Sequence, residues 1–239
     1  MATLALDVEQ DLKKRAAALR RHILTMASGG QIIHVGGSMS VADVMACLVF
    51  HYLDLEGKGG GRDHLVLSKG HTVHAFHACL AEMGLVDPGE FKTLGQMGTR
   101  LAGHPSRRAP LVEVATGSLG HGLSIGIGMA LAERLNGKGA KTVVIMGDGE
   151  LQEGSVWEAA LSAPRFGLDN LLAIVDRNGF QATGAVNDIL PLDPLPEKWR
   201  SFGWNAREIN GHDIGAILAM LVSCPHRRNR RSSSLIRSR

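Results

Sequence analysis

The sequence predicts an α/β fold built on a doubly wound, mostly parallel sheet. Residues 142–146 and 171–175 are short apolar runs rich in β-branched residues, and each ends at a polar or glycine turn, as buried strands do. Residues 154–165 between them have helical spacing, and Gly167 follows as a stop signal. A right-handed crossover returns the chain to the edge it left, so both turns should lie at the edge where open α/β sheets bind ligands.

Length and composition indicate one large domain. With 239 residues, of which 44% are apolar, the chain can bury a substantial core. Its three cysteines show no paired spacing, which argues against a disulfide framework and a structural zinc site. The sequence has no apolar run long enough for a membrane helix, and its start carries acidic residues where a signal peptide would be basic and then apolar. We therefore expect a soluble, cytoplasmic protein without a membrane segment.

Positive charge is concentrated at the carboxyl end. Residues 226–239 hold six arginines and no acid, so removing them changes the net charge from +3 to −3. We predict a folded domain over residues 10–222 and a basic Arg/Ser tail over residues 223–239 without regular structure, because the tail has no apolar periodicity. No aromatic residues that could stack on bases are interleaved with the arginines, which disfavours a nucleic-acid-binding arm.

The first elements follow from hydrophobic spacing and glycine positions. Residues 7–27 carry apolar side chains at helical spacing with Lys and Arg on the other side, which predicts an amphipathic surface helix. Residues 34–38 form a flexible glycine turn, and residues 40–43 can cap a helix that reaches about Tyr52. The glycine-rich segment 57–62 lacks the ending of a phosphate-binding P-loop, so we interpret it as a connection.

A short strand over residues 63–68 leads into a helix that begins at residues 69–71. This helix carries His71, His74 and His77, each three residues apart. Their side chains drift around the helix, so all three would be poorly placed to bind one zinc ion. His71 at the helix start is well placed for an anion, because the backbone N–H groups and the helix dipole add to the attraction.

The remaining elements are assigned by the same signals. We expect, in order, a helix starting at Asp87-Pro88, a loop over 95–110, a helix of small residues ending near 135, a proline-marked loop over 191–196, a short helix over 197–202, a strand over 205–209 and a final helix after Asp213. Gly122, Gly126 and Gly128 in the small-residue helix would each cost stability unless a neighbour needed the space, so we expect close packing there.

The two turns at the sheet edge hold oxygen ligands. Asp148 offers a carboxylate, Asn178 an amide oxygen and Phe180 a backbone carbonyl, while Gly147 and Gly149 let the backbone come close to a ligand. The 28 residues between Gly149 and Asn178 are about the length of one strand–helix–strand unit, so the ligands can converge. An oxygen-only set with open coordination positions suits Mg²⁺, or Ca²⁺, shared with phosphate oxygens.

These motifs resemble those of thiamine-diphosphate enzymes. A GDG turn followed roughly thirty residues later by an Asn turn is similar to their diphosphate and metal motif, and GDGELQEGSVWEAAL with DRNGFQATG resembles the transketolase family in particular. The segments HVGGSMSVADV, SKGH, GHP, TGSLGHG and GHD resemble the same family, although His121 stands where the family often has glutamine. The resemblance covers residues 10–222 and implies the thiamine-diphosphate-binding (PP) domain of that family.

The resemblance also implies roles for individual residues. The metal Mg²⁺ would be held by Asp148, Asn178 and the Phe180 carbonyl. Thiamine diphosphate would be bound by the set His71, Gly117, Ser118, Leu119, Asp148, Gly149, Glu150, Asn178 and His212. The implied catalytic histidines, which would orient sugar oxygens and move protons, are His34, His71, His104 and His212.

The implied activity is thiamine-diphosphate-dependent transfer of a two-carbon ketol unit from a ketose phosphate to an aldose phosphate. Transketolases have a second, pyrimidine-binding domain that carries the cofactor-activating glutamate, and this chain matches the first domain alone. The resemblance therefore implies the N-terminal subunit of a split transketolase, which works with a separate C-terminal pyrimidine-binding subunit on sugar-phosphate substrates. A homodimer or a heterotetramer is the implied assembly.

Two alternatives remain at this point. The family pattern continues past residue 222 into another strand, whereas here Cys224-Pro225 leads into the basic tail, so the chain could be a truncated, non-catalytic half with an exposed sheet edge. The second alternative is a different thiamine enzyme, such as a deoxyxylulose-phosphate synthase. A 2-oxo acid dehydrogenase component is disfavoured by the set of histidines and by the GHD segment.

Overall fold

A parallel sheet forms the centre of the molecule, in a computed structural model that describes residues 2–29, 33–59, 61–137, 139–224 and 234–238. Its five strands are arranged in the order β1-β2-β3-β7-β6, and every neighbouring pair is parallel. The strands are β1 (His64–Leu67), β2 (Thr142–Gly147), β3 (Leu171–Asp176), β6 (Asn205–Ile209) and β7 (Ser234–Ser238). A separate antiparallel hairpin joins β4 (Phe180–Gln181) to β5 (Gly184–Ala185).

Helices and helical turns connect these strands. The α-helices are α1 (Ala2–Ser28), α2 (Val35–Ser40), α3 (Ala42–Cys47), α4 (Val73–Glu82), α5 (Gly122–Leu135), α6 (Gly154–Phe166), α7 (Val186–Ile189), α8 (Leu195–Ser201) and α9 (Ile214–Ser223). A π-helical turn, η1 (Leu48–Tyr52), continues α3, and short 3₁₀ turns are η2 (Gly70–Thr72), η3 (Pro88–Thr93) and η4 (Gly149–Gln152). No helix in the described ranges is long and apolar enough to cross a membrane.

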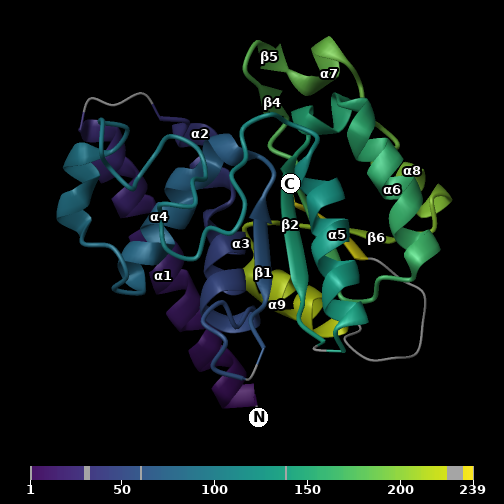
Figure 1. The fold of residues 1–239 in the computed structure, drawn as a ribbon, viewed down its shortest axis with the longest axis horizontal. Helices are drawn as coiled ribbons and strands as arrows, with labels where there is room; N and C mark the ends of the chain where they lie inside the picture. Colours follow the sequence, from purple (N-terminus) through teal and green to yellow (C-terminus); the bar gives the residue numbers. More distant parts are fainter. Residues whose placement is uncertain (1, 30–32, 60, 138, 225–233, 239) are drawn as a thin grey trace.

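The sheet has a hydrophobic core on each face. Alternate strand residues such as Val143 and Ile145 pack with α1, α3, α4 and α9 on one face. Their neighbours Val144 and Met146 pack with α5, α6 and α8 on the other. Figure 1 shows α1, α3 and α4 to one side of β1 and β2, and α5 and α6 to the other. This confirms the predicted α/β fold with helices on both faces of a parallel sheet, in which strands buried on both sides are continuously apolar.

Most predicted elements are present. The predicted amphipathic helix is α1, whose apolar face is buried at Leu12, Leu19 and Ile23. The helix α6 ends at Gly167, which has a φ of 60° in the left-handed region that glycine adopts without a Cβ clash. One expectation was wrong, because the glycine-containing segment after His34 is the helix α2 and not a flexible turn.

The carboxyl end corrects a second expectation. We predicted no regular structure over residues 223–239, but Ser234–Ser238 forms the strand β7 between β3 and β6. Its backbone pairs with a strand on each side, from Leu172 to Asp176 and from Asn205 to Ile209. Backbone pairing of this kind does not require apolar periodicity, which is why the arginine-rich composition gave no signal. Residues 225–233 and 239 lie outside the described residues.

Candidate functional site

Two loops meet at the carboxyl edge of β2 and β3, as the spacing predicted. The last paired residues of the two strands are Gly147 and Asp176. The backbone N–H of Asp148 donates to the Asp176 carbonyl at 3.2 Å, and the Asp148 Oδ2 accepts from the Gly179 N–H at 2.8 Å. The turn after β2 is therefore bound directly to the turn after β3, and β4 and β5 lie at this same end of the sheet (Figure 1).

A second feature of this edge is the buried carboxylate of Asp148. It is buried, and burial raises its pKa above the ordinary range despite hydrogen bonds from the N–H groups of Gly179 and Gly149. Among the described residues no basic side chain forms an ion pair with it. Nor do those residues include a cluster of three or more His, Cys, Asp or Glu side chains that could hold a metal. A cation here would therefore need oxygens from other groups as well.

The chemistry of the donor set fits a hard divalent cation. Asn178 Oδ1 accepts a hydrogen bond from the Phe180 N–H at 3.0 Å, so the turn brings the side-chain oxygen close to the backbone of Phe180. A carboxylate, an amide oxygen and a carbonyl leave room for further oxygens from a ligand, as Mg²⁺ requires. A Cβ added to Gly149 would lie 2.9 Å from the Gln181 Cβ, so the hairpin approaches this turn too closely for a side chain.

Glu150 is already engaged by the protein. Its Oε1 accepts from the Gly120 N–H at 2.9 Å and from the Ser68 hydroxyl, and its Oε2 accepts from the Gly147 N–H at 3.1 Å. Burial raises the pKa of Glu150, although these hydrogen bonds oppose the shift. The carboxylate thus joins three segments of the site. The cofactor contact expected of Glu150 would have to come from its backbone.

Three of the four predicted catalytic histidines lie together. The ring centroids of His34 and His71 are 5.2 Å apart, and those of His34 and His104 are 6.3 Å apart. Burial, helped by the Lys69 charge, lowers the pKa of His71 to about 4, and burial also lowers the pKa of His104. At neutral pH these two rings are therefore uncharged. They can donate and accept hydrogen bonds without carrying a charge.

The segment predicted to contact the cofactor borders this histidine cluster. The Thr116 hydroxyl donates to the Leu67 carbonyl at 2.6 Å, which fixes the segment against the end of β1. A Cβ added to Gly117 would lie 3.6 Å from the His104 ring. Gly117 and Ser118 are exposed and Leu119 is half-buried, so this segment is accessible to a ligand.

His212 is bound to a carboxylate of α3. Its Nδ1 lies 2.8 Å from Asp43 Oδ2, and Asp43 also accepts from Arg20 of α1 at 2.5 Å. Burial would raise the pKa of Asp43, but the hydrogen bonds from Arg20 and His212 outweigh it and hold that pKa below its ordinary value. His212 follows β6, and β7 separates β6 from β3. His212 is therefore linked to α1 and α3 through Asp43.

Sequence reasoning missed a buried ion pair under the site. Lys69 Nζ lies 2.5 Å from Asp176 Oδ2, and the Ser40 hydroxyl donates to Asp176 Oδ1 at 2.7 Å. Lys69 is 1% exposed and Asp176 is 2% exposed, so neither charge is accessible to solvent. The sequence did offer one signal, because Lys69 directly follows an apolar strand run and Asp176 ends another. Together they make Asp148 the carboxylate that remains for a cation.

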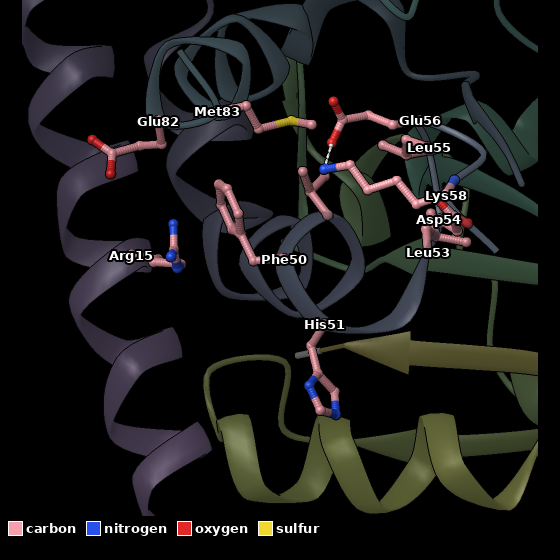
Figure 2. A pocket seen from close by; sticks show the side chains of 11 residues that line it. Arg15, Phe50, His51, Leu53, Asp54, Leu55, Glu56, Lys58, Glu82 and Met83 are labelled. Carbon is pink, nitrogen blue, oxygen red and sulfur yellow. Dashed lines mark hydrogen bonds and ion pairs between the residues drawn. The ribbon is translucent and has the colours of Figure 1, made fainter. Parts of the chain in front are cut away.

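A pocket elsewhere on the molecule contains none of the predicted residues. It lies between α1, η1 and the end of α4, has a volume of about 390 Å³, and is lined by charged and apolar side chains (Figure 2). Its charges are paired within the protein: Arg15 with Asp11, Lys58 with Glu56 and Glu82 with His22. These charges are therefore not free for a ligand, and the candidate site stays at the sheet edge.

Comparisons with known proteins show what the chain as a whole is similar to. A family model described as transketolase, thiamine diphosphate binding domain, matches residues 12–239. The chain is 37% identical over 212 residues to an apulose-4-phosphate transketolase subunit of Phocaeicola vulgatus, covering 87% of this chain and 75% of that protein. It is 38% identical to the 6-deoxy-6-sulfo-D-fructose transketolase subunit SqwG of a Clostridium species, covering 95% of this chain and 84% of that protein.

A solved structure gives the same result. The transketolase from Leishmania mexicana superposes with a TM-score of 0.87 at 26% identity, covering 95% of this chain and 36% of the solved chain. The chain thus spans about a third of this solved transketolase, but three quarters or more of the Phocaeicola and Clostridium subunits.

Proposed function

Because this chain belongs to the transketolase family and carries its thiamine-diphosphate-binding domain, we propose that it is the N-terminal subunit of a split transketolase. Two relatives that match most of its length are named as separate transketolase subunits, which supports a partner that supplies the pyrimidine-binding half. The observation that carries the proposal is the buried Asp148 carboxylate, bound across the edge to Gly179 beside the Asn178 turn. The proposed assembly is a homodimer or a heterotetramer with the partner.

Bound thiamine diphosphate would supply the carbanion chemistry that moves a two-carbon ketol unit from a ketose phosphate to an aldose phosphate. Asp148, Asn178 and the Phe180 carbonyl would hold Mg²⁺, or Ca²⁺, on the diphosphate. Gly149 has no side chain, so the diphosphate could approach its backbone closely.

The histidine cluster would position the sugar. Neutral His71 and His104, with His34 beside them, offer ring nitrogens that can donate to or accept from sugar hydroxyls without a charge. Gly117, Ser118 and Leu119 would line the cofactor through their backbone. His212 is proposed with less structural support, since its Nδ1 is bound to Asp43. Three buried cysteines that form no disulfide within the described residues suit a reducing compartment, which supports a cytoplasmic location.

Calorimetric titration of thiamine diphosphate with Mg²⁺ tests the proposal. The purified full chain is titrated alone and after mixing with the candidate partner subunit. We expect metal-dependent binding that appears or tightens with the partner and weakens about a hundredfold in Asp148→Ala, because that variant removes the charged metal ligand. Asp169→Ala, at the opposite end of β3, is the matched control and should bind normally.

The opposite result identifies the alternative. No heat in either mixture, from a chain shown to be folded by circular dichroism, would support a non-catalytic half that retains the motif without the chemistry. Equal binding by the wild type and Asp148→Ala would reject the metal site assigned here.

A further inference from the structure

The loop before the cofactor segment contains a strained residue. Leu111 has a φ of 60°, and it is the one residue other than glycine with positive φ in the described part of the chain. Such a backbone is disfavoured for a residue with a large side chain, and it persists where surrounding contacts hold it. One contact is visible, because Arg62 Nη2 donates to the Leu111 carbonyl at 3.1 Å.

A cluster of charged groups holds the same loop two residues later. Arg62 Nη2 lies 3.4 Å from Glu113 Oε1, and His64 Nδ1 lies 2.8 Å from Glu113 Oε2. The other ring nitrogen of His64, Nε2, lies 3.4 Å from Glu133 Oε1 on α5. His64 therefore joins β1, the loop and α5, and its side chain is 14% exposed. We call Arg62 and His64 the loop clamp.

The protonation state of His64 decides how many of its carboxylate partners it can donate to. A neutral imidazole has one N–H and can donate to one carboxylate, whereas an imidazolium donates to both. The hydrogen bond with Glu113 raises the pKa of His64, burial opposes the shift, and Glu133 adds to the increase. Two other charged residues lie nearby. Asp63 forms an ion pair with Lys141 at 2.7 Å, and Arg62 forms an ion pair with Glu113, the same carboxylate that His64 contacts. The bridge to both glutamates is thus strongest while His64 is protonated.

The clamped loop leads directly into the candidate site. Thr116 is bound to the Leu67 carbonyl, Gly117 lies against His104, and the Gly120 N–H donates to Glu150. These contacts fix the far end of residues 111–119. Arg62 and His64 fix the near end through Leu111 and Glu113.

We propose that Arg62 and His64 are positioning residues that hold residues 111–119 in the conformation needed to bind thiamine diphosphate. The part that concerns the cofactor rests on the proposed function, whereas the hold on the loop does not. Neither residue was singled out by the sequence motifs, and neither contacts the site itself.

Hydrogen–deuterium exchange of the full chain without cofactor tests the hold on the loop. In Arg62→Ala we expect peptides covering residues 109–119 to exchange about tenfold faster, as the loss of hydrogen bonds from a charged group implies, with no change in β2 or β3. Adding Leu111→Gly should restore slow exchange in part, because glycine adopts a positive φ freely.

A matched control is available in Arg100. It has the same 39% side-chain exposure as Arg62 and also binds a carboxylate, Glu90, and a backbone carbonyl, that of Leu85. Because these contacts lie on a different loop, Arg100→Ala should leave exchange over residues 109–119 unchanged. Faster exchange there in both variants, or in neither, would overturn the proposal.

The pH dependence of cofactor binding tests the role of the clamp. The charged bridge of His64 is present at low pH and is lost as pH rises through its raised pKa, so Mg²⁺-dependent affinity for thiamine diphosphate should decline over that range. His64→Gln should bind about tenfold more weakly at about pH 6 and lack this decline. His64→Arg, which stays charged, should keep tight binding at about pH 8.5.

The two failures are distinguishable. If the wild type does not bind the cofactor, the proposed function fails and the exchange experiment still decides whether the clamp exists. If the wild type binds and both His64→Gln and Arg62→Ala bind equally well across the pH range, the clamp does not position the site.

Discussion

At the residue scale, the site depends on how buried charges are compensated. Lys69 and Asp176 neutralise each other below the edge, and Glu150 is satisfied by Gly120, Gly147 and Ser68. Asp148 differs, because its hydrogen bonds come from two backbone N–H groups and burial still raises its pKa. A divalent cation would supply the missing positive charge, which makes Asp148 the residue whose function is most clearly separate from folding.

The Lys69–Asp176 pair gives a prediction about stability. Lys69→Met leaves the Asp176 carboxylate buried beside Asp148 without its cation, and we expect the free energy of unfolding to fall by about 3 kcal/mol or more. The double variant Lys69→Met, Asp176→Asn should recover most of this loss, because an amide needs no counter-charge and still accepts from Ser40. Urea unfolding of both variants measures the difference. A double variant as unstable as the single one would show that packing, not charge, explains the loss.

At the scale of elements, α5 illustrates how glycine sets the distance between helix and sheet. A Cβ added to Gly126 would lie 2.3 Å from Val144 Cγ2 of β2, and one added to Gly122 would lie 2.3 Å from the Ser68 side chain. Around Gly128 a Cβ would meet nothing within 4 Å. The expectation of close packing is confirmed for the first two glycines and is wrong for Gly128 within this chain.

These glycines provide a matched pair of substitutions. Gly126→Ala should lower the free energy of unfolding by about 2 kcal/mol, because the new methyl group forces α5 away from β2. Gly128→Ala, half a turn away and exposed, should raise it by up to about 1 kcal/mol, since alanine favours the helix. Thermal and urea unfolding of the two variants check the signs. Destabilisation by both would mean that α5 is covered on its outer side in solution.

Sequence alone was sufficient where a local pattern specifies the structure. The two apolar runs gave β2 and β3, and the spacing from Gly149 to Asn178 correctly placed both turns at one edge. Contacts that depend on the order of strands could not be predicted. The Lys69–Asp176 pair requires β1 and β3 to flank β2, and the position of β7 between β3 and β6 was concealed by the tail's composition.

At the scale of the whole molecule, two hydrophobic cores enclose one sheet. On the face covered by α1 and α4, the core contains two histidines, His74 and His77, which are fully buried with ring centroids 6.0 Å apart. Within the described residues, neither nitrogen of the His77 ring has a hydrogen-bond partner. Burial lowers the pKa of His74 to about 4 and that of His77 to about 3. Both rings are therefore neutral in the folded state.

These neutral rings make the fold sensitive to acid. Their folded-state pKa values lie below the value of 6.5 expected when unfolded, so the unfolded chain binds protons first as pH falls. The stability that these neutral rings contribute is fully present above about pH 6.5. As pH falls toward the folded-state pKa values, the free energy of unfolding declines by about 2 kcal/mol for each histidine at about pH 5. His77→Leu removes one of the two titratable rings, together with two buried nitrogens that have no hydrogen-bond partner. The substitution costs stability only through the different shape of the leucine side chain.

We therefore expect His77→Leu to match or exceed the wild type in urea unfolding at about pH 7.5, and to lose about 2 kcal/mol less between that pH and about pH 5. The exposed His51 provides the control, because His51→Gln should follow the wild-type decline. Parallel declines for the wild type and His77→Leu would show that His77 is not held neutral in the core. A shallower decline in the variant alone would show that the neutral His77 ring contributes to the loss of stability in acid.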